Sequence, residues 1–187
     1  MWTRLECVFQ MTTIIGLQAK DSCLLVADSR VTDDGGRTYS HPNMQKITKR
    51  GKYLIAGAGT TQPCDIIQHI WKPPTPTPAA YKDLYHFMIA EVVPSMRHCL
   101  AVNGYTPDKE SDEPDFIFLI ALGGRIFEID ETLSVLLRDD NIYGIGSGAA
   151  YAIGALQAGM NWRKAMQIAA KNNVFTAPPF VHVKQSR

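Results

Sequence analysis

Strand-like and helix-like segments occur in blocks along this chain, and this order constrains the fold more than any single residue does. Runs of β-branched and apolar residues predict strands over residues 12–20, 23–28, 44–48, 52–59, 116–122 and 125–130. Two helical segments follow the first block of strands, and two more follow the second. Because single strands do not alternate with single helices, the order predicts an α+β domain in which two antiparallel sheets pack between two helical layers.

The first pair of helices is marked by its start and break signals. Thr61 and Pro63 are suited to start a helix over 64–71. The proline-rich stretch 71–80 predicts an extended connector. A longer helix is expected from about Ala80, and Pro94 is expected to kink or interrupt it.

The remaining turns and helices follow from glycine, asparagine and small residues. Asp34-Gly35-Gly36 predicts a hairpin tip, and Gly123-Gly124 predicts the turn of the clearest hairpin. The segment 107–115 is expected to be an acidic surface loop. Small residues predict a helix over 149–158, and Asn161 is suited to cap another over 162–171.

Composition narrows the class of protein. The 187 residues suffice for one domain, and a net charge of +1 without a basic, aromatic-interleaved patch gives no indication of nucleic-acid binding. The four cysteines are widely separated, so neither a zinc site nor a disulfide framework is expected, and we expect reduced thiols in a cytoplasmic protein. No apolar run approaches the roughly 20 residues that span a membrane, and residues 1–10 do not resemble a signal peptide. No metal or cofactor is expected.

The stretch MTTIIG, Met11 to Gly16, has two interpretations. It can be an ordinary first strand. Alternatively, Thr12 becomes a free N-terminus that acts as a nucleophile. A threonine hydroxyl needs a nearby base, and an α-amine with a pKa of roughly 7.7–8.0 on the same residue can serve as that base.

An ordered set of residues favours the second interpretation. Asp28 ends the segment VAD, Arg30 follows it, Lys46 lies in NMQKI, Gly57 lies in IAGAG, and Ser147 lies in GIGSG. With TTIIG, this set resembles the N-terminal-nucleophile hydrolases of the proteasome β-subunit family, most closely the bacterial HslV-type peptidase subunit. The resemblance extends from Met11 to about Thr176 and implies a four-layer αββα sandwich.

The resemblance also implies a role for each of these residues. Thr12 Oγ would attack the peptide carbonyl, and Lys46, held by Asp28, would lower the pKa of the Thr12 amine or hydroxyl. The Gly57 N–H would stabilise the oxyanion. Ser147 would hydrogen-bond near the Thr12 amine, besides being suited to cap the helix after it, and Arg30 would brace the site.

Besides changed spacings between Arg30 and Lys46 and between Lys46 and Gly57, the sequence departs from the family pattern in two places that bear on catalysis. The family usually has an aspartate near the end of the last helix, but no Asp or Glu follows Asp140. Asn172 or Asn173 is the candidate neutral substitute. The second departure is the stretch 1–11, because Thr12 needs a free amine. We treat 1–11 as a mis-assigned start or a removable propeptide, favouring a start at Met11, and 12–187 as the peptidase domain.

The predicted function is therefore a threonine endopeptidase. By resemblance, its substrates would be unfolded polypeptides or peptides, and its subunits would form stacked hexameric or heptameric rings, with an ATPase unfoldase as a further partner. Two alternatives stay open: a weakly active or inactive ring or assembly protein, and a small-molecule amidase of the same nucleophile class. The segment 144–150, GIGSGAA, loosely resembles a dinucleotide-binding turn, but no ribose-binding acid follows it.

Overall fold

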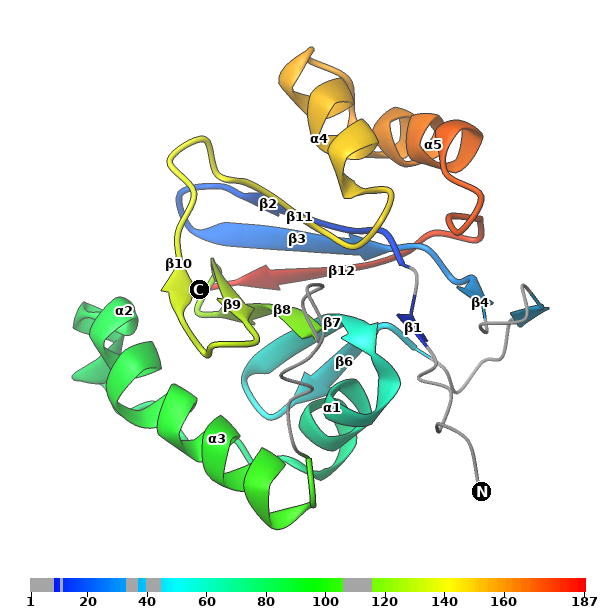
Figure 1. The fold of residues 1–187 in the computed structure, drawn as a ribbon. Helices are drawn as coiled ribbons and strands as arrows, with labels where there is room; N and C mark the ends of the chain where they lie inside the picture. Colours follow the sequence, from blue (N-terminus) through cyan, green and yellow to red (C-terminus); the bar gives the residue numbers. More distant parts are fainter. Residues whose placement is uncertain (1–8, 11, 33–36, 40–44, 106–115) are drawn as a thin grey trace, which may run out of the picture.

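The computed structural model describes residues 9–10, 12–32, 37–39, 45–105 and 116–187. The predicted hairpin tip at 34–36, the acidic loop at 107–115 and Met11 lie outside the described residues. The described part contains two larger antiparallel sheets, with helices on the outer side of each (Figure 1). The α+β prediction is thus confirmed.

The larger sheet is built around a long central hairpin. Its strand order is β1-β7-β8-β9-β10, and β6 also pairs with β7. The turn between β8 and β9 consists of Gly123 and Gly124, both with positive φ, as the sequence predicted. The bounds are β1 Phe9–Gln10, β6 Ile47–Arg50, β7 Tyr53–Thr60, β8 Phe116–Leu122, β9 Arg125–Asp130 and β10 Val135–Leu136.

The smaller sheet has four strands in the order β11-β2-β3-β12. Its bounds are β2 Ile14–Gln18, β3 Ser22–Ala27, β11 Ile142–Ile145 and β12 Val181–Ser186. No element was predicted after residue 171, so β12 was not expected. This strand pairs with β3 along its whole length. A separate short pair joins β4 Val31–Thr32 to β5 Thr38–Tyr39.

The first helical layer differs in detail from the prediction. The first helix is α1 Thr61–Asp65, which continues as a π-helical segment, η1 Ile66–Ile70. The long helix begins at α2 Leu84–Phe87, after a short 3₁₀ turn, η2 Ala80–Lys82, and continues through a π-helical segment, η3 Met88–Val92, into α3 Val93–Val102.

Pro94 does not interrupt this long helix, so the interruption, one of the two predicted outcomes, is wrong, while the predicted kink stays a prediction. Pro94 lies in the first turn of α3, directly after the π-helical segment. A proline is tolerated in a first turn, because the N–H that it lacks would have no intrahelical partner there.

The second helical layer follows the prediction closely. It contains α4 Ala149–Gln157 and α5 Trp162–Asn172. The Asn161 side chain caps α5 by accepting the Lys164 N–H at 3.0 Å, as expected. None of the described helices is long and apolar enough to cross a membrane.

Three apolar clusters hold these layers together. One lies between the two sheets and includes Ile14, Leu25, Ala56 and Leu119. A second joins the outer face of the larger sheet to the helices α1 to α3, and a third joins Ile15 and Val26 of the smaller sheet to α4 and α5. Because neighbouring residues of a strand face opposite sides, Ile14 and Ile15 serve two different clusters. Helices, sheet, sheet and helices therefore succeed one another across the described residues (Figure 1).

Candidate active site

Thr12 lies immediately before β2 and is fully buried. Its hydroxyl has no hydrogen-bond partner among the described residues. A buried polar group is normally satisfied, because an unmet hydrogen bond costs about 1–3 kcal/mol. The described residues contain four more such hydroxyls, on Ser29, Thr32, Thr48 and Thr60, so the unpaired Thr12 hydroxyl indicates a chemical role only together with the charged groups beside it.

Asp28 anchors the backbone beside Thr12. It follows β3 directly, and its Oδ1 accepts the Thr13 N–H at 2.9 Å and the Lys46 ammonium at 2.6 Å. Its Oδ2 accepts the N–H groups of Arg30, at 3.0 Å, and Ala177, at 3.2 Å. One carboxylate thus connects the start of β2, the end of β3 and the segment before β12.

Lys46 is only 4% exposed and forms a buried ion pair with Asp28. Its ammonium also donates to the Arg30 carbonyl, at 2.5 Å. Burial lowers the pKa of Lys46, and the Asp28 carboxylate counteracts this by favouring the charged form. A buried cation beside a nucleophile can lower the pKa of neighbouring groups without being exposed to solvent.

The register of β6 and β7 brings Gly57 opposite Lys46. Ile47 of β6 pairs with Ala56 of β7 in an antiparallel arrangement. The preceding residue of one strand then faces the following residue of the other, so Lys46 lies across from Gly57.

Gly57 itself leaves no room for a side chain. A Cβ built at this position would lie 2.7 Å from the Phe118 ring and 2.9 Å from the Cys64 sulfur. On the edge of β7 opposite β8, the pairing with β6 ends at Ala56, and the pairing with β1 starts at Gly59. A short stretch of β7 edge around Gly57 is therefore without a strand partner among the described residues.

The turn after β11 brings Ser147 to the same place. Ile145 pairs with Ile14, which sets the following turn beside Thr12. A Cβ on Gly146 would lie 2.0 Å from the Thr12 carbonyl oxygen, so the backbones touch here. The Ser147 hydroxyl does not cap α4, as the sequence had suggested, because the N-cap is Gly148 and no side chain caps it. Instead it points to Asn173, with Oγ 3.4 Å from Oδ1.

Asn173 forms the centre of a small hydroxyl network. Its Oδ1 accepts the Thr176 hydroxyl at 3.0 Å and the Phe175 N–H at 3.0 Å, besides the contact with Ser147. The Thr176 hydroxyl lies 2.6 Å from that of Thr13. Since Thr176 donates to Asn173, Thr13 must donate to Thr176. The network thus reaches the residue next to Thr12.

The structure separates the two candidate asparagines. Asn172 turns its side-chain amide to the Ile168 carbonyl within its own helix, at 2.8 Å, whereas Asn173 faces Ser147. Thr13 and Thr176 were not singled out from the sequence. Thr13 adjoins the predicted nucleophile, which was the available signal. Thr176 carried none, because its side chain reaches Thr13 only through the tertiary fold.

Arg30 joins the end of β3 to the segment after α5. Its backbone N–H binds Asp28, and its guanidinium donates to the Val174 carbonyl. It therefore contacts the partners of the site without reaching Thr12 through any described hydrogen bond. Most of the predicted site residues therefore lie at the same end of the sheets as Thr12. These are Asp28, Arg30, Lys46 and Ser147, with Gly57 near Lys46 on the neighbouring strand.

Residues that precede Thr12 lie along the same strand edge. Phe9 pairs with Thr60 and Gln10 with Gly59, which makes β1 an antiparallel neighbour of the end of β7. Among the described residues, no group of His, Cys, Asp and Glu is arranged to hold a metal ion.

The fold is similar to solved structures that include BPH and a eukaryotic HslV. BPH from Thiobacillus denitrificans in complex with epoxomicin aligns with a TM-score of 0.70 at 21% identity, over 94% of this chain and 98% of that chain. HslV from Trypanosoma brucei aligns with a TM-score of 0.62 at 21% identity, over 94% of this chain and 100% of that chain. No protein-family model and no curated protein sequence matches the chain. The resemblance drawn from the sequence is confirmed at the level of the fold.

Proposed function

We propose that this chain is a threonine endopeptidase subunit of a self-compartmentalised, HslV-like protease, with Thr12 as its nucleophile. One observation carries the proposal: a buried Lys46–Asp28 ion pair is tied to the Thr13 backbone, directly beside a buried threonine hydroxyl that has no partner. We also take the observed layering to be the four-layer αββα sandwich of N-terminal-nucleophile hydrolases.

The first chemical step uses both functional groups of Thr12. Its amine takes the proton from Oγ while Oγ forms a bond to the carbonyl carbon of the substrate. The positive charge of Lys46 keeps the amine neutral by lowering its pKa, and Asp28 holds Lys46 in place. When the tetrahedral intermediate collapses, the C–N bond breaks and the amine returns its proton to the leaving amine. Water then hydrolyses the ester that remains on Thr12.

Gly57 is proposed as the oxyanion donor. Its position across from Lys46, on a short unpaired edge of β7, is compatible with a backbone N–H facing a bound carbonyl. Such a donor contributes on the order of 10²–10³ in rate. An extended peptide substrate would lie along this same edge, where β1 pairs with Gly59 and Thr60.

Ser147 and Asn173 are proposed to orient the amine of Thr12. An amide oxygen only accepts hydrogen bonds, so the Ser147 hydroxyl donates its proton to Asn173 Oδ1. Its lone pairs are then free to accept a hydrogen bond from the amine. Asn173 occupies the place for which the resemblance implied an aspartate. Its neutral amide lacks the negative charge that would raise the pKa of the amine. Arg30 braces this arrangement from the side of Val174.

Catalysis of this kind requires a Thr12 with a free amine. While residues 1–11 remain attached, Thr12 carries an amide and cannot serve as its own base. The intact mass of the protein from its own host tests this requirement directly. A chain that starts at Thr12 supports the proposal, whereas an assembled protein that retains Met1 to Met11 favours the alternative of an inactive ring or assembly protein.

The activity itself is tested with the chain that starts at Thr12. We expect hydrolysis of fluorogenic peptides that disappears in Thr12→Ala, and covalent addition of epoxomicin, an epoxyketone peptide, that also disappears in this variant. Thr13→Ser serves as the matched control, because it retains a hydroxyl beside Thr176. Hydrolysis that persists in Thr12→Ala would overturn the proposal. By the same fold likeness, we propose stacked rings and an ATPase unfoldase as the assembly, and unfolded polypeptides as substrates.

A further inference from the structure

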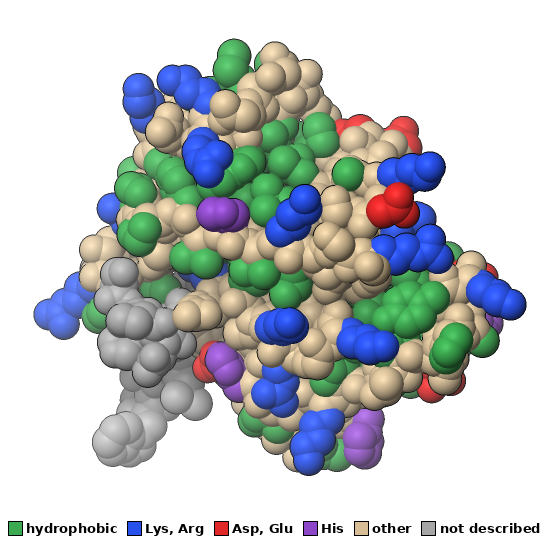
Figure 2. All heavy atoms as spheres, turned by 180° about the vertical axis from the view of Figure 1, so that it is seen from behind, with side chains coloured by type: hydrophobic (Ala, Val, Ile, Leu, Met, Phe, Trp, Pro, Cys, Tyr) green, Lys and Arg blue, Asp and Glu red, His purple; other side chains and the backbone are tan. Residues whose placement is uncertain are grey.

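A buried glutamine of the first helical layer contacts the backbone of Lys46. On the face seen in Figure 2, Lys and Arg side chains stand at the surface, whereas Lys46 is only 4% exposed. Gln68, in the π-helical segment η1, is 2% exposed. Its side-chain Nε2 donates to the Lys46 carbonyl at 2.9 Å and to the Ile55 carbonyl at 3.3 Å. None of the proposed catalytic steps involves Gln68 directly.

The two partners of Gln68 define the orientation of its side chain. Both are carbonyl oxygens, which only accept hydrogen bonds, so the amide nitrogen with its two hydrogens must face them. A buried amide is costly unless it is hydrogen-bonded. Gln68 lies in a stretch whose residues Ile66, Ile67 and Trp71 belong to an apolar cluster. The two hydrogen bonds thus explain how a polar side chain can occupy this position.

Lys46 lies just outside the regular strand pairing. The pairing of β6 with β7 starts at Ile47 and does not include Lys46. The Lys46 ammonium is held by Asp28 and by the Arg30 carbonyl, and its own carbonyl is held by Gln68. The residue is therefore fixed at both ends, through its side chain by the segment after β3 and through its backbone by the first helical layer.

The second acceptor connects Lys46 to the strand that carries Gly57. Ile55 lies two residues before Gly57 in β7. One amide group therefore bridges the residue that supplies the positive charge and the strand that supplies the proposed oxyanion donor. The segment η1 is itself held in place, since the Arg50 guanidinium of β6 donates to the Trp71 carbonyl at 2.9 Å. The bridge thus starts from an anchored element.

We propose that Gln68 is a positioning residue that fixes Lys46 relative to Gly57, and that peptide hydrolysis depends on this arrangement. The inference rests on the proposed function, because Gln68 acts only through Lys46 and Gly57. These two residues serve one reaction from different sides: Lys46 acts on the Thr12 amine, and the Gly57 N–H acts on the oxyanion. A displacement of about 1 Å between such groups can cost on the order of 10²-fold in rate.

A second glutamine forms the same kind of bridge far from Thr12. Gln185 Nε2 donates to the Lys52 carbonyl at 2.9 Å and to the Ala121 carbonyl at 3.3 Å. Its Oε1 accepts the Gly124 N–H at 3.0 Å, so Gln185 lies beside the turn between β8 and β9. The chain therefore offers a matched control for the loss of an amide bridge.

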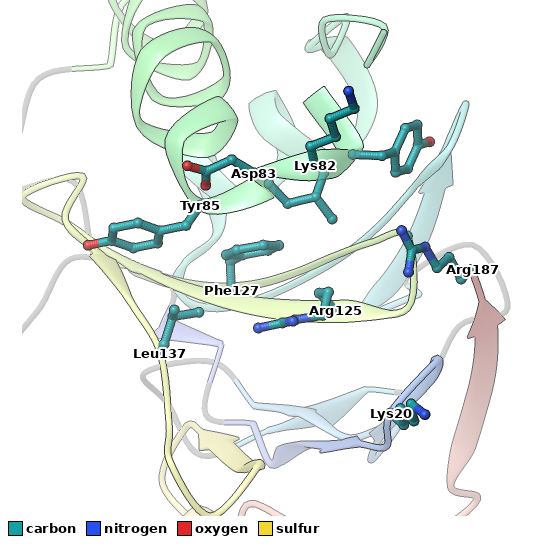
Figure 3. Close-up of a pocket in the computed structure, with 11 residues that line it drawn as sticks. Lys20, Lys82, Asp83, Tyr85, Arg125, Phe127, Leu137 and Arg187 are labelled. Atoms are coloured by element: carbon teal, nitrogen blue, oxygen red, sulfur yellow. The ribbon is translucent and has the colours of Figure 1, made fainter. Parts of the chain in front are cut away.

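This turn marks the end of the sheets opposite Thr12, which we call the Gly123 end. Gln185 pairs with Cys23, and Cys23 pairs with Gln18 at the far end of β2. Figure 3 shows a surface hollow at the Gly123 end, lined by residues that include Arg125 and Arg187. A substitution of Gln185 thus acts at a distance from the candidate site.

The test compares Gln68→Met with Gln185→Met in the chain that starts at Thr12. Methionine is unbranched and of similar length but has no hydrogen-bond donor, so each variant loses one bridge and should unfold at a lower temperature. Only Gln68→Met should also lower kcat, by about tenfold or more, with KM nearly unchanged. It should shift the acid limb of kcat/KM upward by about 0.5 pH unit or more, because a displaced Lys46 favours the neutral Thr12 amine less strongly.

A second substitution covers the case in which Gln68→Met does not fold. Gln68→Asn retains an amide, but its side chain is one methylene shorter and does not reach both carbonyls, so we expect the same loss of kcat and the same shift. If the folded Gln68 variants keep the wild-type kcat and pH profile, or change them no more than Gln185→Met does, Gln68 only stabilises the fold and the inference is wrong.

Crystal structures of the variants give a readout that does not need activity. Lys46 should be displaced relative to Gly57 in the Gln68 variants and should keep its place in Gln185→Met. An unchanged Lys46 in the Gln68 variants overturns the inference even in an active peptidase. Hydrolysis that persists in Thr12→Ala overturns the proposed function instead, and the position of Lys46 still decides whether Gln68 holds it.

Discussion

The two ends of the sheets differ in whether their cations are buried and paired or exposed and unpaired. At the Thr12 end, one cation is buried, paired with Asp28 at 2.6 Å and bound to a backbone carbonyl. At the Gly123 end, seven cations that line two adjoining hollows are exposed and have no ion-pair partner among the described residues, and these are Lys20, Lys49, Lys52, Lys82, Arg125, Lys184 and Arg187. A charge in the first setting is fixed in position and acts on its neighbours at short range. Charges in the second act collectively, at longer range, and are screened by salt.

This difference indicates how each end should respond to mutation. Removing one partner of a buried ion pair leaves an uncompensated charge, which is costly. Removing one of several exposed like charges changes little in the folded chain and can even relieve repulsion. We therefore expect the largest effects of substitution at the buried end and the smallest at the exposed end.

Lys46→Ala should have the largest effect. It leaves the Asp28 carboxylate buried without its cation, and we expect a loss of about 3–5 kcal/mol in the free energy of unfolding. Urea titration measures this loss. Lys171→Ala, an exposed lysine at the end of α5, should change the stability by less than about 0.5 kcal/mol. Equal effects in the two variants would show that the buried pair is not structurally important.

Gly146→Ala should come next. Gly146 has a φ of 88°, and an added Cβ would lie 2.0 Å from the Thr12 carbonyl oxygen. Both the backbone conformation and the contact must change, so we expect a loss of about 2–4 kcal/mol and of peptidase activity. Gly154→Ala in α4 is the control, because nothing lies within 4 Å of its added Cβ. It should raise the stability by about 0.5–1 kcal/mol, since alanine favours a helix. Thermal unfolding of both variants checks the pair.

The sequence predicted the central strands and their turns better than the course of the first helical layer. Its alternation and turn signals are local, and the hairpin around Gly123-Gly124 and the cap at Asn161 appear as expected. The continuation of the helix through Pro94 depends on a π-helical segment, and β12 depends on pairing with a strand more than 150 positions earlier. Such tertiary effects leave no local pattern.

The same limit applies to the candidate site. Thr12, Asp28 and Lys46 were selected by order along the chain, and the structure brings them together, although their catalytic roles stay predictions. The choice between Asn172 and Asn173 could not be made from the sequence. It depends on the direction in which each side chain points at the end of α5, and only that of Asn173 points to Ser147. The cluster of exposed cations at the Gly123 end was also not predicted, since these cations come from five separate segments of the chain.

Asn173→Asp adds a charge to the buried end and should move the pH profile. A carboxylate beside Ser147 would favour the protonated Thr12 amine and so raise its pKa, partly against the effect of Lys46. The amine would then become a free base only at higher pH. In a variant that retains Asp28, Lys46 and Arg30, we expect the acid limb of the pH profile of kcat/KM to shift upward by about one pH unit.

Asn172→Asp is the matched control for this shift. It adds the same charge one residue earlier, where the side chain faces the Ile168 carbonyl of its own helix. A shift of equal size in the two variants would mean that general charge near α5, and not the contact with Ser147, sets the profile.

Arg125→Ala should have the smallest effect on folding. The side chain is exposed and unpaired among the described residues, so we expect a change in the free energy of unfolding within about 0.5 kcal/mol. Urea titration of the variant beside the wild type measures this change. A destabilisation as large as that of Lys46→Ala would show that Arg125 is held by strong interactions with the remaining chain. A small effect would instead show that the two ends differ in energetic role: folding depends on the buried cation Lys46 and not on the exposed cation Arg125.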